Sequence, residues 1–266
     1  MGEERFGEFV LVRRHEDGHV AELALDRPKA MNAVSTDMAR SLAAACAALG
    51  RDRDVRVVVL TSTHERAFCV GADLKERNSF SDADLVRQRP VTRGAYTGVL
   101  ELPVPSIAAL HGFALGGGFE IALACDLIVA DRTAVVGLPE VSVGVIPGGG
   151  GTQLLPRRVG AARAAELIFT ARRVEAAEAR EWGLVDQLVE EGRDRAEALA
   201  LAARIAANSP VGLRAAKQAL RLGHGLDLRA GLEVEDAAWR SVAFSGDRAE
   251  GVAAFNEKRA PNWPGE

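Results

Sequence analysis

The chain has 266 residues and a mass of 28.2 kDa, enough for one large hydrophobic core with a smaller appended element. Hydrophobic residues make up 48% of it and charged residues 26%, which is typical of a globular protein. The net charge of -4, a pI near 5.8 and the absence of a basic stripe argue against a nucleic-acid-binding protein.

Neither a targeting segment nor a disulfide framework is expected. The N-terminus is charged and has no long apolar stretch, and no run approaches the roughly 18 apolar residues that cross a bilayer. We therefore expect a cytoplasmic protein without a membrane anchor. The three cysteines, Cys46, Cys69 and Cys125, are far apart and form no C-x-x-C pair, which favours reduced, buried thiols over a zinc cluster.

The first third of the chain is predicted to be mixed α/β. Segments 9–14 and 19–28 alternate like two strands, joined by a hairpin turn at Asp17-Gly18. Ser35 is expected to cap a helix that runs to about Leu49 and stops at Gly50. The apolar segment 55–62 then reads as a buried strand.

Strand-rich units give way to helices further along the chain. A helix is expected over 81–101, a short strand entering a turn over 104–115, a helix from about Gly117, and strands over 126–131 and 134–137. From about Gly160 the pattern is mainly helical. We divide the chain into a core, 1–200, and a C-terminal helical oligomerisation element, 201–266, whose apolar face needs either the core or another subunit as a partner.

One motif is a chance match. "HEDGH", with His15 and His19, fits the H-E-x-x-H zinc-hydrolase pattern, which requires both histidines on one helix face. Because Asp17-Gly18 lies between alternating strands, the histidines are expected on a hairpin turn, and no metal site is predicted.

The glycine runs do not fit nucleotide-binding motifs. "PGGGGTQ" lacks the Gly-Lys-Ser/Thr ending of a P-loop, and "HGFALGGGFE" lacks the G-x-G-x-x-G spacing. The run Gly116 to Gly118 instead exposes backbone N–H groups at a helix start, where the dipole favours negative charge. Taken alone, close helix packing explains these glycines equally well.

A second segment strengthens the case for an anion site. In "FCVGADLKE", Gly71-Ala72 lies between a predicted strand and a predicted helix. Two donors from separate segments can hold a carbonyl oxygen as it gains charge, as in a thioester enolate. Glu120 and Glu140 both stand in mainly apolar surroundings, where a carboxylate costs free energy unless it is paired or used. Their spacing of 20 residues leaves room for a helix and a strand pair, so the two acids could meet in one cleft.

These segments together resemble a known family. "FCVGADLKE", "HGFALGGGFEIALACD", "GLPEVSVGVIPGGGGTQLLPRRVG" and "FNEKRAPNWPGE" resemble the crotonase superfamily, specifically its enoyl-CoA hydratases, from about Phe9 to the C-terminus. The resemblance implies an α/β fold, a crotonase-like spiral of ββα units with a C-terminal helical trimerisation region. It also implies a homotrimer, or a homohexamer built as a dimer of trimers.

The resemblance implies that the backbone N–H groups of Ala72 and Gly117 form the oxyanion hole and that Glu120 and Glu140 are the catalytic pair. The implied reaction adds water to a trans-2-enoyl-CoA and gives the 3-hydroxyacyl-CoA, so coenzyme A belongs to the substrate and no separate cofactor is expected. Glu120, near the positive helix end, should be the base, and Glu140, in a more apolar segment, the acid. Because two close carboxylates titrate as a pair, the opposite assignment stays open.

Coenzyme A contacts are implied for two loops and for the last helix of a neighbouring subunit. The matching residues are Lys29, Ala30, Met31, Ala72, Asp73, Leu74 and Lys75 in the loops, and Phe255 and Lys258 in the helix. Three of the four lysines of the chain fall at these positions, and a compact ammonium suits a phosphate. Solvated surface lysines are the alternative explanation.

Within the family, the motifs are most similar to the methylglutaconyl-CoA hydratases, also known as AU-rich RNA-binding homologues. The segment that matches their lysine-rich helix, 35–56, has no lysine here, so we expect no specific RNA binding. Arg77, Arg87, Arg89 and Arg93 could bind a carboxylate at the far end of an acyl chain, but a solvated arginine-rich helix face is the simpler explanation.

Other functions stay open as alternatives. Related enzymes isomerise enoyl-CoA double bonds, hydrolyse thioesters or act specifically on methylglutaconyl-CoA, and product analysis would distinguish these reactions. A non-catalytic acyl-CoA-binding protein would keep the coenzyme A motifs without needing both glutamates.

Overall fold

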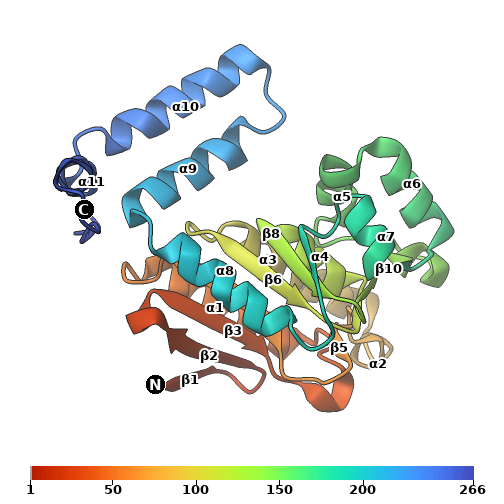
Figure 1. Cartoon of the computed structure of the whole chain (residues 1–266). Coiled ribbons are helices and arrows are strands. Elements are labelled where there is room, and N and C mark those ends of the chain that lie inside the picture. Colours follow the sequence, from red (N-terminus) through yellow and green to blue (C-terminus); the bar gives the residue numbers. More distant parts are fainter. Residues whose placement is uncertain (1) are drawn as a thin grey trace.

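The computed structural model describes residues 2–266, whose strands form two sheets (Figure 1). The larger sheet has the order β1 (Glu3–Phe6), β2 (Val10–His15), β3 (Val20–Leu25), β4 (Val57–Ser62), β6 (Ser106–Leu110), β8 (Leu127–Asp131) and β11 (Gln187–Val189). The smaller sheet has the order β10 (Val174–Glu175), β9 (Val135–Gly137), β7 (Phe113–Leu115) and β5 (Ala67–Cys69). Strands from β3 to β11 in the larger sheet run parallel, as do β5, β7 and β9 in the smaller one.

The chain consists of repeated ββα units whose strands alternate between the two sheets. One unit is β4, β5 and the helices α2 (Leu74–Arg77) and α3 (Asp82–Leu100), the next is β6, β7 and α4 (Gly117–Ala124), and the third is β8, β9 and the 3₁₀ helix η3 (Pro139–Val143). Each unit adds one strand to the larger sheet and one to the smaller. This arrangement confirms the predicted α/β spiral of ββα units.

The central strands of the larger sheet, β3, β4, β6 and β8, are buried on both faces, which explains their nearly continuous apolar sequences. In β4, Val58 and Leu60 join the main core beneath α1 (Thr36–Arg51) and α3, whereas Val57 and Val59 face α8 (Asp194–Ala206). Small residues of α8, such as Ala198 and Ala202, allow that helix to lie close to the sheet. Side chains alternate between the faces as expected for a strand.

The first predicted helix is confirmed except for its end. Ser35 caps α1, its hydroxyl accepting the Met38 N–H at 3.2 Å. The predicted stop at Gly50 is wrong, because Gly50 is not among the residues with a positive φ and the helix continues to Arg51. Asp52, in an extended conformation, ends it instead.

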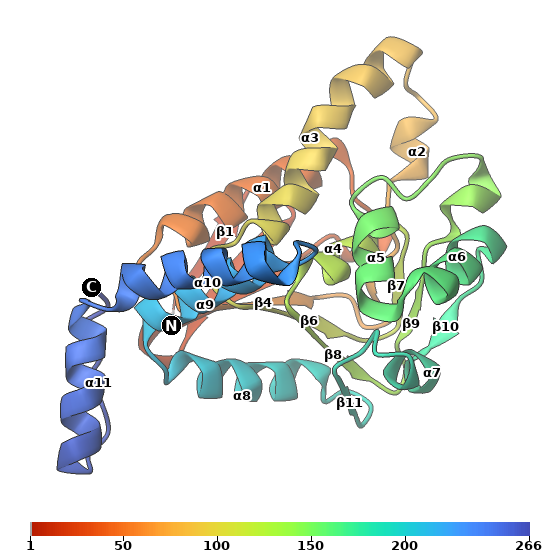
Figure 2. The same cartoon turned by 90° about the horizontal axis from the view of Figure 1, so that it is seen from above.

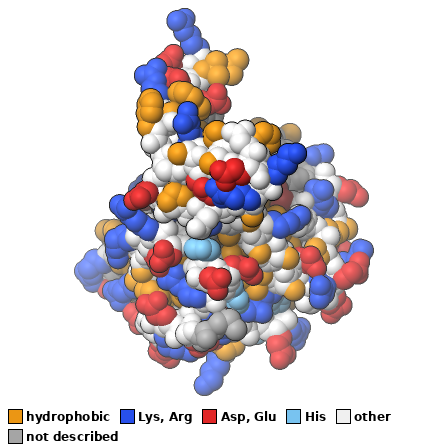
Figure 3. Space-filling view, turned by 60° about the vertical axis from the view of Figure 1, so that its left-hand side comes forward, with side chains coloured by type: hydrophobic (Ala, Val, Ile, Leu, Met, Phe, Trp, Pro, Cys, Tyr) orange, Lys and Arg blue, Asp and Glu red, His pale blue; other side chains and the backbone are white. Residues whose placement is uncertain are grey.

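The helices α5 (Gly151–Val159), α6 (Ala161–Thr170) and α7 (Ala176–Glu181) pack beside the smaller sheet, and the three last helices project from the core (Figures 1 and 2). These are α9 (Pro210–Gly223), α10 (Leu228–Val242) and α11 (Gly246–Glu257). These helices and the turn between α10 and α11 carry large exposed apolar side chains, including Trp239 and Phe244, and the projection is visible as a knob in Figure 3. The predicted boundary at residue 200 lies within α8, and the division of the chain there stays a prediction.

The hairpin prediction is confirmed. His15 ends β2, a 3₁₀ turn over Glu16–Gly18 (η1) follows, and β3 begins at Val20. His15 Nε2 lies 2.9 Å from Glu22, whereas His19 Nδ1 lies 3.0 Å from the Asp54 carbonyl, so the two rings have different partners. Across residues 2–266, no three His, Cys, Asp or Glu side chains are grouped to hold a metal ion.

The three cysteines are buried and free, as expected. Among the helices of residues 2–266, none combines the length and the apolar character that crossing a membrane requires.

Candidate active site

The candidate site lies at the ends of three neighbouring parallel strands of the smaller sheet. β5 leads to Gly71 and Ala72, β7 to Gly116 and Gly117, and β9 to Glu140. Since these strands run parallel, their carboxyl ends meet at one edge of the sheet, which is where α/β proteins bind ligands. Residues far apart in the sequence are brought together there.

The Ala72 N–H group is left free by the pairing of its neighbours. Residues 34 and 72 form a parallel bridge in which the Val34 N–H donates to the Gly71 carbonyl (2.7 Å) and the Asp73 N–H donates to the Val34 carbonyl (3.1 Å). Because both bonds use the residues that flank Ala72, its own N–H faces the other side. Within residues 2–266 that N–H has no acceptor.

The Gly117 N–H lies close to this segment. Gly117 is the first residue of α4, where backbone N–H groups have no partner within the helix. Gly71 has a φ of +91°, and a Cβ there would lie 3.0 Å from the Gly117 nitrogen and 2.8 Å from the Leu115 carbonyl oxygen. The segment around Gly71 and the start of α4 therefore approach so closely that no side chain fits at Gly71. This approach brings together the two predicted oxyanion donors, the N–H groups of Ala72 and Gly117.

Glu120 lies in the first turn of α4 and is 2% exposed. Its Oε1 accepts hydrogen bonds from the backbone N–H groups of Gly149 and Gly151, each 2.7 Å long. Burial raises the pKa of Glu120, while these donors and the charge of Arg89 act against that rise. The carboxyl group is therefore held in one orientation by the glycine run that follows η3.

Glu140 approaches the same place from η3. A Cβ at Gly116 would lie 2.9 Å from Glu140 Oε1, and Gly116 has a φ of +52°, so only glycine fits this turn. Oε2 of Glu140 is buried and has no hydrogen-bond partner among the described residues. Burial, reinforced by the Glu120 carboxylate, raises the pKa of Glu140 to about 7. The two acids thus differ in their partners, as a proton donor and a proton acceptor would.

A cavity of about 950 Å³ leads to Ala72. It is lined by all seven loop residues predicted to contact coenzyme A: Lys29, Ala30, Met31, Ala72, Asp73, Leu74 and Lys75. The cavity is also lined by residues that were not predicted from the sequence, including Arg5, Phe9 and Arg27. The mixture of cationic and apolar side chains would suit a ligand with both phosphate and apolar parts.

Arg27 ties the two cavity loops together. Its guanidinium lies over the Phe9 ring at 5.3 Å and donates to the Ala33 carbonyl (2.8 Å) and to Asp73 (2.7 Å). Asp73 also caps α2, because its other carboxylate oxygen accepts the N–H groups of Lys75 (3.0 Å) and Glu76 (3.1 Å). Asp73 therefore fixes the helix start that follows Ala72.

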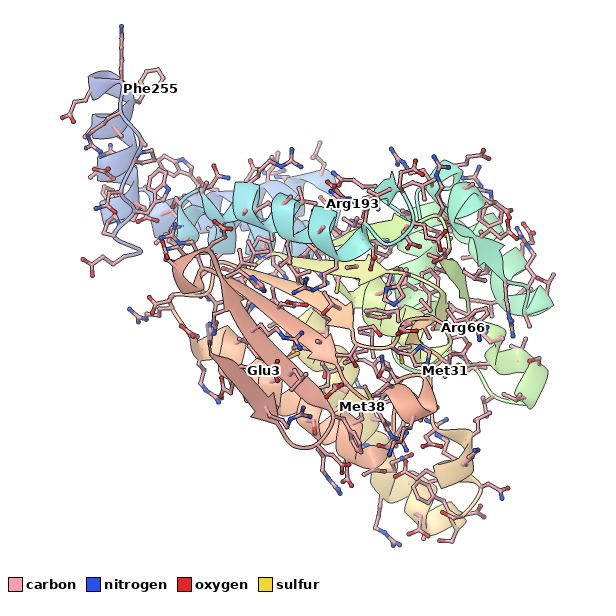
Figure 4. The ribbon with its side chains drawn as sticks, turned by 60° about the horizontal axis from the view of Figure 1, so that its bottom comes forward. Glu3, Met31, Met38, Arg66, Arg193 and Phe255 are labelled. Atoms are coloured by element: carbon pink, nitrogen blue, oxygen red, sulfur yellow. The ribbon has the colours of Figure 1, made fainter. Side chains whose placement is uncertain are left out.

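The structure does not bring the predicted helix residues to this cavity. Figure 4 shows Phe255 on the projecting helix α11, far from Met31 in the cavity loop. Phe255 is 83% exposed. Any contact of Phe255 or Lys258 with such a cavity would have to involve another copy of the chain.

The arginines of the α2–α3 region have different surroundings. Arg87 forms an exposed ion pair with Asp84 at 2.6 Å, and Arg89 donates to the Gly148 carbonyl at 2.7 Å. Arg77 is half-buried, and its charge lowers the pKa of Glu140 against the effect of burial. Of these residues, Arg77 and Arg89 are electrostatically linked to the two glutamates.

Two features of the site were missed by sequence reasoning. The run Gly148 to Gly151 was excluded as a P-loop, but its role as a donor to Glu120 was not foreseen, and the crowding of four glycines was the available signal. Tyr96, the single tyrosine of the chain, lies on α3 against Gly117 and Gly149. A polar aromatic residue in an otherwise ordinary helix gave no distinctive signal.

Comparison with known proteins identifies the family of this chain. Residues 15–266 match the family described as enoyl-CoA hydratase/isomerase. The chain is 45% identical to mouse enoyl-CoA hydratase domain-containing protein 2, mitochondrial, over 93% of this chain and 85% of that protein. It is 40% identical to mouse methylglutaconyl-CoA hydratase, mitochondrial, over 94% of this chain and 81% of that protein.

A solved structure is also closely similar. The crystal structure of an enoyl-CoA hydratase from Bacillus anthracis superposes with a TM-score of 0.94 at 40% identity, covering 97% of this chain and all of that one. Sequence and structure lead to the same assignment: the chain belongs to the enoyl-CoA hydratase/isomerase family and is an enzyme with the crotonase fold.

Proposed function

We propose that the enzyme hydrates trans-2-enoyl-CoA thioesters to 3-hydroxyacyl-CoA. The observation that carries this proposal is Oε2 of Glu140, which is buried and has no hydrogen-bond partner among residues 2–266. The Glu140 carboxyl lies against Gly116, at the start of the helix that carries Glu120 and the free Gly117 N–H, and Gly71, which precedes the free Ala72 N–H, is adjacent. A hydratase needs this set of groups, because water must lose a proton, carbon must gain one, and the thioester oxygen must carry charge between the two events.

In the proposed reaction, Glu120 takes a proton from water as the oxygen attacks C3. The electron pair of the C2=C3 bond moves toward the thioester, whose oxygen is stabilised by the N–H groups of Ala72 and Gly117. Glu140 then gives its proton to C2, and proton exchange with solvent restores both acids. The amide donors to Glu120 favour a carboxylate, and the pKa of Glu140, raised to about 7, favours a neutral acid.

The 950 Å³ cavity would hold the coenzyme A part of the substrate, with Lys29 and Lys75 near its phosphates. We further propose a homotrimer or a dimer of trimers, in which α11 of a neighbouring subunit completes the cavity. The exposure of Phe255 and its distance from the cavity of its own chain support this arrangement.

The test is loss of the conjugated enoyl-thioester absorbance on addition of crotonyl-CoA, with Glu120→Gln and Glu140→Gln measured beside the wild type. We expect 3-hydroxybutyryl-CoA from the wild type and losses of about 10² to 10⁴ in kcat for each variant, the usual scale of acid–base catalysis. If the wild type moves the double bond without adding water, an isomerase replaces the hydratase.

A further inference from the structure

Tyr96 meets both glycine segments of the site. It lies on α3 and is 6% exposed. A Cβ at Gly117 would overlap the Tyr96 hydroxyl, and a Cβ at Gly149 would lie 2.7 to 2.8 Å from three ring carbons. The ring therefore rests on Gly149, a donor to Glu120, and its hydroxyl rests on Gly117, a predicted oxyanion donor.

The Tyr96 hydroxyl is neutral and has no protein partner. None of the hydrogen bonds formed by residues 2–266 involves it, and it is not one of the fully enclosed polar atoms, so it borders free space. Burial, reinforced by the Glu120 carboxylate, raises the pKa of Tyr96 above its ordinary value. Tyr96 therefore borders the site with its ring and a neutral hydroxyl and does not act as a base.

The 950 Å³ cavity does not extend to Tyr96. The cavity is lined by residues 5–33 and 70–75, and neither α3 nor the Gly116–Gly151 region contributes to it. A thioester held at Ala72 and Gly117 would have its carrier in the cavity and its reacting carbons near Glu120 and Glu140. The Tyr96 hydroxyl lies against Gly117 and its ring against Gly149, so an acyl chain that continues past the two acids in this direction would meet this side chain.

We propose that Tyr96 limits the length of the acyl chain and makes short-chain enoyl-CoA thioesters, of about four carbons, the substrate class of this enzyme. This inference rests on the proposed hydratase function. Its physical basis is packing. A longer acyl chain would have to displace the buried Tyr96 side chain, which packs against the backbones of Gly117 and Gly149.

The experiment compares crotonyl-CoA with trans-2-decenoyl-CoA as substrates for the wild type, Tyr96→Ala, Tyr96→Leu and Tyr96→Phe. The matched control is Val99→Ala, which shortens a fully buried side chain three residues further along α3. We expect the ten-carbon to four-carbon ratio of kcat/KM to rise at least about 10-fold in the alanine and leucine variants, since single methylenes already change such ratios by about 10-fold or more. Tyr96→Phe and Val99→Ala should keep the wild-type ratio.

The inference is overturned if the wild type prefers decenoyl-CoA, if the ratio stays the same in both shortened variants, or if Val99→Ala changes it as much. A binding measurement separates this inference from the proposed function. Titration with butyryl-CoA and decanoyl-CoA, which cannot be hydrated, should show the same shift in preference between wild type and Tyr96→Leu. Absence of turnover together with that shift would end the hydratase proposal and leave the role of Tyr96 standing.

The single tyrosine also permits a direct probe. Incorporated 3-fluorotyrosine would give one ¹⁹F resonance, from position 96. Saturating butyryl-CoA should shift this resonance, whereas an unshifted signal would show that the ring does not border the acyl chain.

Discussion

The Glu120 carboxylate is bound by the Gly151 backbone, 31 residues further along the chain, through a hydrogen bond of 2.7 Å. A Cβ at Gly151 would lie 3.0 Å from the same Glu120 oxygen and 2.9 Å from Leu138 and Pro147. The orientation of the acid thus depends on a position that has no room for a side chain.

Gly151→Ala should therefore lower kcat toward crotonyl-CoA by about 10²-fold, because a small displacement of a catalytic group has an effect of that size. Gly94→Ala is the matched control, since a Cβ at Gly94 meets nothing within 4 Å. Equal kcat values for Gly151→Ala and the wild type would show that the amide does not position Glu120.

The pH profile should have an alkaline limb near pH 7. The proposed role of Glu140 requires its protonated form, so activity is present below its pKa of about 7 and is lost as the pH rises through that value. Arg77 lowers this pKa, so Arg77→Gln should move the limb to higher pH. Arg87→Gln, which removes an exposed arginine paired with Asp84, should leave the limb in place. A limb that moves to lower pH in Arg77→Gln would show that Glu140 is not the group that titrates there.

The partly buried ion pair between Lys217 and Asp126 should stabilise the packing of α9 on the core. Lys217 Nζ lies 2.7 Å from Asp126 and 2.7 Å from the Val104 carbonyl, and Lys217 is 7% exposed. Lys217→Met should lower the free energy of unfolding in urea by about 2 kcal/mol, the scale of a hydrogen bond between charged groups. The Asp126 carboxylate would keep Arg221 as its cationic partner and the Ser106 backbone N–H and hydroxyl as donors. Arg240→Met, which breaks an exposed pair on α10, should cost less than about 1 kcal/mol.

The three cysteines should be unreactive in the native protein. Burial raises the pKa of Cys46, Cys69 and Cys125 to about 12 in each case, so almost no thiolate is present at neutral pH. A thiol reagent such as DTNB should react with no cysteine in buffer and with all three in denaturant. Rapid reaction of even one thiol in buffer would contradict the packing around it.

Mixing two inactive variants should test whether subunits share a site. Glu120→Gln lacks the proposed base, and Lys258→Ala lacks the lysine that a neighbour is expected to contribute. After refolding together, some subunits would combine an intact Glu120 with a neighbour's Lys258, so crotonyl-CoA turnover should exceed the sum of the separate variants. No gain, in a sample that light scattering shows to be a trimer or hexamer, would place Lys258 outside the shared site.

Local chemistry made part of this structure predictable. Ser35 as a helix cap, Asp17-Gly18 as a turn and Gly117 as a helix start each follow from interactions within a few residues. Strands β4 and β8 were predicted because burial on both faces requires continuous apolar runs. Segment 104–115, predicted as one short strand that enters a turn, instead contains two strands, β6 and β7, in different sheets. Gly50 misled the prediction because a glycine can also occupy an ordinary helical position when the helix ends at the next polar residue.

The site itself was only partly predictable. Glu120, Glu140, Ala72 and Gly117 were named from motifs and a family resemblance, and their roles stay predictions. The contacts of Arg89 with Gly148 and of Tyr96 with Gly149 join segments more than 50 residues apart. Such pairings depend on the register of the whole spiral, which no local pattern in one sequence specifies.

The position of the site at the ends of three neighbouring strands has a consequence for biosynthesis. Ala72, Glu120 and Glu140 come from different turns of the spiral, and the orientation of Glu120 depends on Gly149 and Gly151. On a ribosome, which releases the N-terminus first, a chain cut short before residue 149 would contain both acids and both N–H donors without the backbone that positions Glu120. Catalytic activity should therefore appear late in translation. Chains cut short before residue 149 should be inactive even if their first strands pair correctly.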